Sequence, residues 1–184
     1  YNSKSRKMEN ILQSFKDEIE ELFKAYRMAH FSLYNMKSTY YNFKISNPEI
    51  ENFVLEDEDF NNLVRFNEKE INKNSEGGSY QRIIAGSTIA MFFNIWEDKY
   101  RKIIAEKVGV KKDDIKSDFF AELRLIRQSV THNNFQAIRD LKRLDKLSFV
   151  GDPTHLKLSS FEVQKIYEEL VKEIDQIASL YSAH

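Results

Sequence analysis

Apolar residues recur at steps of three and four along the first part of the chain, which is the spacing of one face of a helix. Most charged residues lie off this seam, as expected for a solvated face. Asn47-Pro48 disfavours helical backbone and ends the pattern. The pattern predicts one long helix over residues 1–45. Its heptad-like seam consists of Met8, Leu12, Phe15, Ile19, Leu22, Tyr26, Ala29, Leu33, Met36 and Tyr40.

A second helix is predicted from Tyr80 to about Val108. This segment is apolar nearly all round at first and amphipathic later, and Gly109 is placed to end it. Ser79 is placed to cap its start. Gly86 in the interior costs about 1 kcal/mol relative to alanine. Because that cost needs a reason, we expect the glycine to permit close approach of another helix.

Two more helices follow, one over residues 117–132 and one that begins after Ser159 or Ser160. The first turns an apolar side toward a core, made of Phe119, Leu123, Ile126 and Val130. The second has an apolar seam at Val163, Ile166, Leu170, Ile174, Ile177 and Tyr181. The chain is therefore predicted to be all-α, a helical bundle of about four to five helices with up-and-down character.

Two stretches do not show helical periodicity. Residues 49–64 carry six carboxylates and no Lys or Arg, and both short strands and an irregular insertion fit their apolar residues. A solvated loop is favoured there over a metal site. Residues 148–158 contain Gly151-Asp152-Pro153, which indicates a turn between two short β-like pieces. We expect a single domain over residues 1–184, with an acidic insertion or loop at 49–78.

Composition narrows the classes of function. With 184 residues, 31% charged residues, 5 Gly and 2 Pro, the chain suits one domain with long helices. A net charge of −1 means that nucleic-acid binding needs a local basic patch. The chain has no cysteine, and its four histidines lack metal-ligand spacing, so we expect no metal and no cofactor. No signal peptide is visible and no apolar run is long enough to span a bilayer, so a cytoplasmic protein is expected.

The helix over residues 117–132 carries the residues with the clearest chemistry. On the side away from its core it presents Arg124, Arg127, Gln128, Thr131 and His132. Arginine offers a planar fork that matches phosphate oxygens, and histidine exchanges protons near neutral pH. These two groups suit RNA cleavage without a metal, because the ribose 2′-hydroxyl supplies the nucleophile and the protein moves protons and neutralises charge.

Helix geometry limits what one copy of the chain can do. Arg127 and His132 are five residues apart, and five steps of about 100° place them about 140° apart around the helix. One straight helix therefore does not hold both on one phosphate, unless it ends or distorts near residues 131–133. The alternative is a symmetric dimer, in which two such helices meet and share their residues in one cleft.

The segment Arg127-Gln128-Ser129-Val130-Thr131-His132 resembles the motif of the HEPN superfamily, in which an arginine and a neighbouring polar residue are followed by a histidine. The lead-in Leu123–Arg127 and the following Asn133-Asn134 also fit, as does the helix with Gly86-Ser87, Trp96-Glu97 and Tyr100-Arg101. The resemblance covers residues 80–180. The first helix is compatible with it, and the acidic insertion has no counterpart.

The resemblance implies a helical bundle that dimerises through the motif helix and that is often a metal-independent endoribonuclease in phage defence or a toxin–antitoxin system. Its partners would be RNA and an antitoxin or another defence-system protein, and no membrane. The catalytic arginine, polar residue and histidine correspond to Arg127, Gln128 and His132. Glutamine is a departure, because the polar residue is more often Asn, Asp or His. It can hydrogen-bond but cannot exchange a proton, which leaves the proton transfer to His132.

Residues 124–146 hold six Lys or Arg and two Asp, a net charge of +4, which suits an RNA backbone. The candidate RNA-binding residues are Arg124, Asn133, Arg139, Lys142 and Arg143. Two other hypotheses stay open. One is a non-catalytic HEPN-like dimer that binds nucleic acid or a partner protein. The other is a structural bundle that uses the first seam for assembly.

Overall fold

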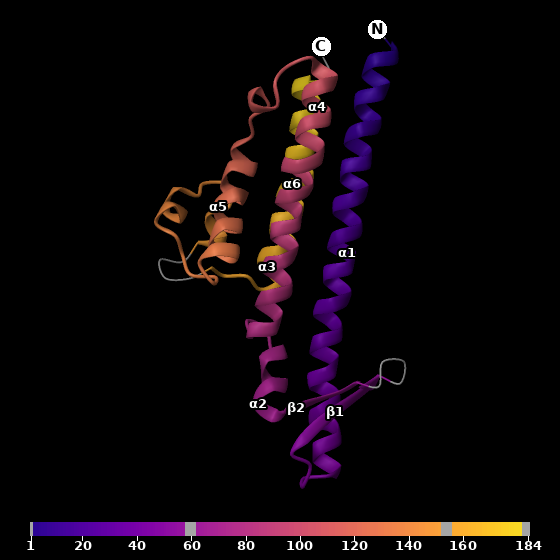
Figure 1. Ribbon diagram of the computed structural model, residues 1–184, viewed down its shortest axis with the longest axis vertical. Coiled ribbons are helices and arrows are strands. Elements are labelled where there is room, and N and C mark those ends of the chain that lie inside the picture. The colour runs from indigo at the N-terminus through magenta and orange to yellow at the C-terminus, as the bar shows by residue number, and fades with distance from the viewer. Residues whose placement is uncertain (1, 58–61, 152–155, 182–184) are drawn as a thin grey trace.

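Four long helical segments run side by side in the computed structural model, and successive segments reverse direction (Figure 1). The structure describes residues 2–57, 62–151 and 156–181. This confirms the predicted all-α bundle with a long first helix. Within the described residues the segments are α1 (Asn2–Ser46), the continuous α3 (Ser79–Asn94) and α4 (Arg101–Val108), α5 (Asp118–His132) and α6 (Ser160–Tyr181).

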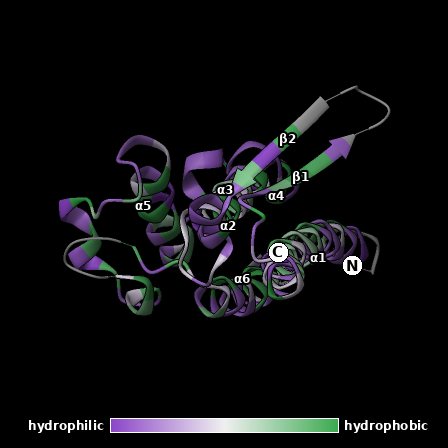
Figure 2. Ribbon diagram, turned by 90° about the horizontal axis from the view of Figure 1, so that it is seen from below, coloured by the Kyte–Doolittle hydropathy of each residue, from purple (hydrophilic) through white to green (hydrophobic). Residues whose placement is uncertain are grey.

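The α3–α4 helix occupies the centre of the molecule. It packs against α1 and α6 on one side and α5 on the other, so α5 and α1 lie on opposite sides of the bundle (Figure 2). An aromatic stack joins α1, the central helix and α5, with Trp96 and Phe120 parallel at a ring-centroid distance of 4.2 Å and Phe15 4.4 Å from Tyr100. Trp96 and Tyr100 are therefore core residues.

The predicted seam of α1 is covered over its first part and again at Tyr40, but not at Ala29. Tyr167 of α6 stacks on Phe23 at 4.2 Å, and Asp175 of α6 pairs with Lys16 at 2.5 Å, so the two helices are antiparallel. Since α6 has 22 residues and α1 has 45, the later part of α1 extends beyond it. Consequently Ala29 of the predicted seam is exposed.

The central helix contains a π-helical segment, Ile95–Tyr100, in which the N–H of Arg101 donates to the carbonyl of Trp96. Gly109 ends the helix with a left-handed φ of 84°, as predicted. The expected cap is wrong by one residue: Gly78 is the N-cap without a side-chain bond, and Ser79 is already helical. Helix boundaries predicted from sequence shift by a residue or two, and glycine adopts the extended backbone of an N-cap as readily as serine does.

Gly86 lies where α3 and α5 come closest. A Cβ atom added there would lie 2.5 Å from Cε1 of Phe135 and 2.8 Å from Cγ1 of Val130. Both distances are shorter than real carbon contacts, so no larger residue fits without movement. This confirms the close helix approach predicted from the sequence.

The acidic insertion contains a β-hairpin, β1 (Asn52–Asp57) paired antiparallel with β2 (Asn62–Asn67), followed by the short helix α2 (Glu68–Ile71). Of the two structures that fitted the sequence, strands are therefore the one formed. Phe53 pairs with Phe66 in the hairpin and packs edge-on against Tyr40 of α1. Among the described residues no His, Cys, Asp and Glu side chains form a group of three or more around a common point. Glu58 and Asp59 of the six carboxylates lie outside the described residues.

The segment between α5 and α6 consists of turns. Arg139–Arg143 and Ser148–Val150 are 3-10 helices, so the predicted β-like piece at residues 148–150 is wrong, and residues 152–155 of the predicted turn lie outside the described residues. The buried carboxylate of Glu122 accepts the backbone N–H groups of residues 145, 146 and 147 at 2.8–3.2 Å. That bond set fixes the turn to α5. Ser159 caps α6, as predicted, by accepting the N–H of Phe161 at 3.2 Å.

No helix in the described part of the chain is both long enough and apolar enough to cross a membrane.

Candidate functional site

The two ends of α5 are fixed by local sequence. Ser117 caps the start, since its Oγ accepts the N–H of Phe120 at 3.1 Å. At the other end His132 is the last helical residue, and the N–H of Phe135 donates back to the carbonyl of Ser129 at 3.0 Å. Asn134 and Phe135 both have left-handed φ values, 48° and 65°, which turn the chain away from the helix axis. The helix therefore ends within residues 131–133, the range that the sequence allowed for an ending.

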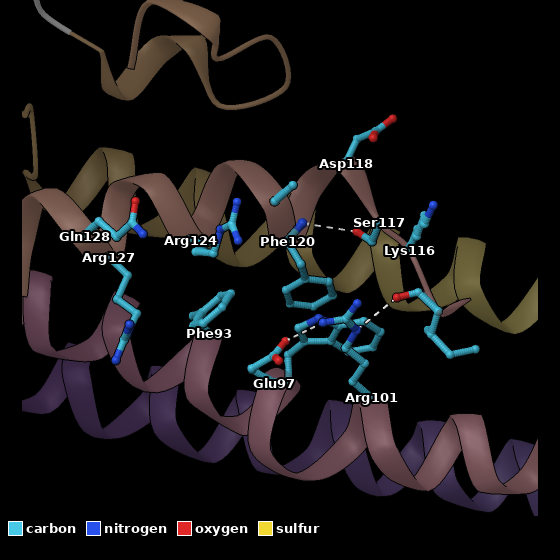
Figure 3. A pocket seen from close by; sticks show the side chains of 13 residues that line it. Phe93, Glu97, Arg101, Lys116, Ser117, Asp118, Phe120, Arg124, Arg127 and Gln128 are labelled. Atoms are coloured by element: carbon cyan, nitrogen blue, oxygen red, sulfur yellow. Dashed lines mark hydrogen bonds and ion pairs between the residues drawn. The ribbon is translucent and has the colours of Figure 1, made fainter. Parts of the chain in front are cut away.

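A cleft of about 450 Å³ lies between the central helix and α5, from the start of α5 to Gln128 (Figure 3). This volume is within the range of small-molecule and cofactor sites. Aromatic rings of Phe93, Trp96 and Phe120 line its base, and they are almost fully buried. The other lining residues are Glu97, Arg101, Ile115, Lys116, Ser117, Asp118, Ala121, Arg124, Arg127 and Gln128.

On one wall of the cleft the charged side chains form ion pairs with one another. Arg101 donates to Glu97 at 2.9 Å and, through Nε, to the carbonyl of Ile115 at 2.9 Å. Lys112 approaches the other carboxylate oxygen of Glu97 at 2.7 Å. Burial pushes the pKa of Glu97 upward, but the hydrogen bonds from Lys112 and Arg101 outweigh burial and hold the pKa below its ordinary value. These bonds join the π-helical segment to the connector before α5.

The opposite wall carries cations with no ion pair among the described residues, namely Lys116, Arg124 and Arg127. The guanidinium of Arg127 lies 5.5 Å from the ring centroid of Phe93, and its buried Nε has no hydrogen-bond partner. Among the described residues Arg127 forms no ion pair with Asp118 or Glu122, the two carboxylates that precede it on α5. Instead, Glu122 binds the backbone of the turn after α5.

The three candidate catalytic residues do not all meet in one copy of the chain. Arg127 and Gln128 line the cleft, whereas His132 is exposed at the end of α5 and is not part of the lining. This agrees with the angle of about 140° between Arg127 and His132 on a helix. The neighbouring Thr131 bonds only within the helix, to the carbonyl of Arg127 at 2.9 Å.

The candidate RNA-binding residues are distributed over three places. Arg124 lines the cleft, while Arg139 and Lys142 line a separate hollow of about 440 Å³ in the turn after α5. Arg143 pairs with Asp140 at 3.4 Å beside a third hollow. Asn133 uses its amide in the helix ending, where it donates to the carbonyl of Gln136 at 3.1 Å.

Part of the predicted basic excess is also neutralised. Lys146 pairs with the buried Glu173 at 2.9 Å, and this hydrogen bond raises the pKa of Lys146 above its ordinary value. With Arg143 paired to Asp140, four of the six cations of residues 124–146 have no ion pair among the described residues. The charge that can meet a ligand is therefore smaller than the sequence total.

Sequence reasoning missed Lys116, Glu97 and Arg101 as site residues. Glu97 and Arg101 are four residues apart on a helix, a spacing that predicts an ion pair. Lys116 precedes a helix-capping serine, which is a weak signal. Neither feature shows that α5 packs alongside to close a cleft.

Comparison of the chain with models of protein families, with curated protein sequences and with solved structures gives no match in any of the three searches.

Proposed function

We propose that the protein is a metal-independent endoribonuclease of the HEPN type, in which two copies meet through α5 and combine their residues in one cleft. His132 would exchange protons, Arg127 would hold the phosphate and its transition-state charge, and Gln128 would hydrogen-bond the phosphate or orient the other two. The proposal extends to a role in phage defence or in a toxin–antitoxin system, with an antitoxin or another defence-system protein as partner.

The observation that carries the proposal is the exposure of His132 at the end of the same helix that lines a cationic cleft. A histidine at an exposed helix end can reach a neighbouring copy without displacing any core residue. Arg127 has no ion pair among the described residues to hold it, and its cation–π contact with Phe93 contributes about 1–2 kcal/mol, so the guanidinium can reorient toward a phosphate. The composite cleft supplies what one copy lacks, an imidazole near a guanidinium.

The chemistry needs only groups that α5 carries. One imidazole removes the proton of the ribose 2′-hydroxyl, and the 2′-oxygen forms a bond to phosphorus. The bond from phosphorus to the 5′-oxygen breaks, and a second imidazole, from the partner's His132, donates a proton to that oxygen. The products are a 2′,3′-cyclic phosphate and a 5′-hydroxyl. Arg127 stabilises the extra negative charge on phosphorus between these events.

The test is cleavage of mixed structured RNA in EDTA by the wild type, His132→Ala and Thr131→Ala. Thr131 is the matched control, because it is exposed beside His132 and bonds only to its own helix. We expect cleavage with 2′,3′-cyclic phosphate ends by the wild type and Thr131→Ala, and a loss of about 10²–10⁴-fold in His132→Ala. A His132→Ala protein that is folded and fully active would disprove the assignment.

The position of His132 outside the cleft favours a second function, a HEPN-like dimer that binds nucleic acid or a partner protein without turnover. This function predicts retention of RNA by the wild type with intact RNA recovered. It also predicts that His132→Ala binds as the wild type does.

A further inference from the structure

The cleft beside α5 differs from its neighbours in charge. Its lining has four cations and two carboxylates, a net charge of +2. The hollow on the other side of α5 is lined by three cations and four carboxylates, a net charge of −1, although Arg124 and Asp118 line both. A polyanion would therefore be attracted to the first and repelled from the second, since charges focused in a recess act more strongly than charges on an open surface.

The cations within the cleft also differ in how free they are. Arg101 is held by Glu97 and by the carbonyl of Ile115. Lys116 and Arg124 are exposed side chains, and with Arg127 they have no ion pair among the described residues. Figure 3 shows Lys116 near the start of α5 and Arg127 near the far end of the cleft, with Arg124 between them. The unpaired cations thus form a row along one helix.

We infer that this row holds the strand of RNA next to the scissile phosphate, so that Lys116 and Arg124 are strand-positioning residues. From Ser117 to Gln128 the helix rises about 16 Å, which is long enough for a short run of nucleotides. The cleft volume of about 450 Å³ is in the range of small-molecule sites, so the cleft is too small to enclose a double helix. This assignment rests on the proposed function for its choice of ligand, but it concerns binding and not cleavage.

A change at Asp118 should alter RNA affinity in the direction opposite to a change at Lys116 or Arg124. It stands at the first turn of α5, lines the cleft, and is exposed without an ion pair among the described residues. Its negative charge opposes a phosphate in the cleft. Asp118→Asn should therefore strengthen RNA binding, whereas Lys116→Ala and Arg124→Ala should weaken it.

The experiment measures fluorescence anisotropy of a short labelled oligouridylate in EDTA, with every variant made in full-length His132→Ala protein so that the strand stays intact. We expect Lys116→Ala and Arg124→Ala each to lower affinity about threefold to tenfold and to reduce the slope of log affinity against log salt by about 0.7. Asp118→Asn should raise affinity about twofold to threefold. Lys102→Ala is the matched control, because Lys102 is an exposed cation on α4 that faces Glu106 outside the cleft.

Competitors identify the ligand. A duplex of the same length should compete poorly, and inorganic phosphate should compete only at concentrations far above those of the strand. Equal competition by duplex, or equal binding by Lys116→Ala, Arg124→Ala and Lys102→Ala, would overturn the inference. If wild-type protein cleaves RNA while these variants bind normally, the inference fails and the proposed function stands. If the variants bind as expected but wild-type protein never cleaves RNA, the cations do bind the strand and the proposed endoribonuclease function fails.

Discussion

The two ends of α5 show two different ways to present a functional group. Lys116, just before α5, and Arg124 and Arg127, before its last turn, lie in a cleft whose opposite wall is an internally paired set of charges. At the end, His132 stands exposed beside a turn that closes against Gly86. The start has a surface that can hold a ligand but no proton donor of suitable chemistry. The end has the proton donor but no surface around it. Under the proposed function, a second copy of the chain would bring the two together.

The largest effect should come from Glu122, which fixes the turn at residues 145–147 to the first half of α5. Glu122→Ala leaves three backbone N–H groups without their acceptor, and one of them belongs to the buried Leu147. We expect the free energy of unfolding in urea to fall by about 2–3 kcal/mol. The exposed Glu106→Ala should change it by less than about 0.5 kcal/mol. Equal stability of the two variants would show that the turn is not anchored by Glu122.

A smaller effect is expected at the other end of α5. Gly86→Ala gains about 1 kcal/mol of helix propensity but places a methyl group 2.5 Å from Phe135 and 2.8 Å from Val130. Overpacking of this kind costs about 1–3 kcal/mol, so the net change should be a loss of about 1 kcal/mol. The displaced turn should lower cleavage while oligouridylate binding at the cleft stays unchanged. Stabilisation by Gly86→Ala would show that Phe135 moves away freely.

The smallest effect concerns the paired wall of the cleft. Because the folded-state pKa of Glu97 is depressed, its stabilisation is present above its unfolded pKa and is lost as the pH falls through the folded pKa. Its side chain is 28% exposed, which limits the effect to less than about 1 kcal/mol. Glu97→Gln should therefore have a lower free energy of unfolding than wild type at neutral pH. When the free energy of unfolding is plotted against pH, the two proteins should converge below about pH 4. Parallel curves over the whole pH range would remove Glu97 from this role.

Most of the fold could be predicted because helix periodicity and helix ends depend on residues that are close in the sequence. The steps of three and four along α1, the stop at Gly109 and the cost of Gly86 each have a physical meaning within a few residues. The hairpin could not be decided, since Phe53 becomes half-buried only through contact with Tyr40 of a distant helix. The cap at Gly78 instead of Ser79 is a shift of one residue between two conformations of similar energy.

The candidate site was predictable only on α5. Periodicity placed Arg124, Arg127 and Gln128 away from the core and, by angle, separated Arg127 from His132. It could not show that the π-helical segment faces them or that Glu122 is used by the turn. Those facts depend on which elements pack together. A pattern along one helix carries no information about the element on the other side of a cleft.

The π-helical segment Ile95–Tyr100 also sets which side of the central helix each residue occupies. A single π turn inserts one extra residue into an α-helix, so the residues before and after it are out of phase by about 100°. Removing one residue from this segment would restore a regular helix and turn Phe93, before the segment, by about 100° relative to Arg101, after it, so the two would no longer line the same cleft. The lining of the cleft thus depends on the phase between the two halves of the central helix, and a deletion of Asp98 would change that phase without removing any residue that lines the cleft.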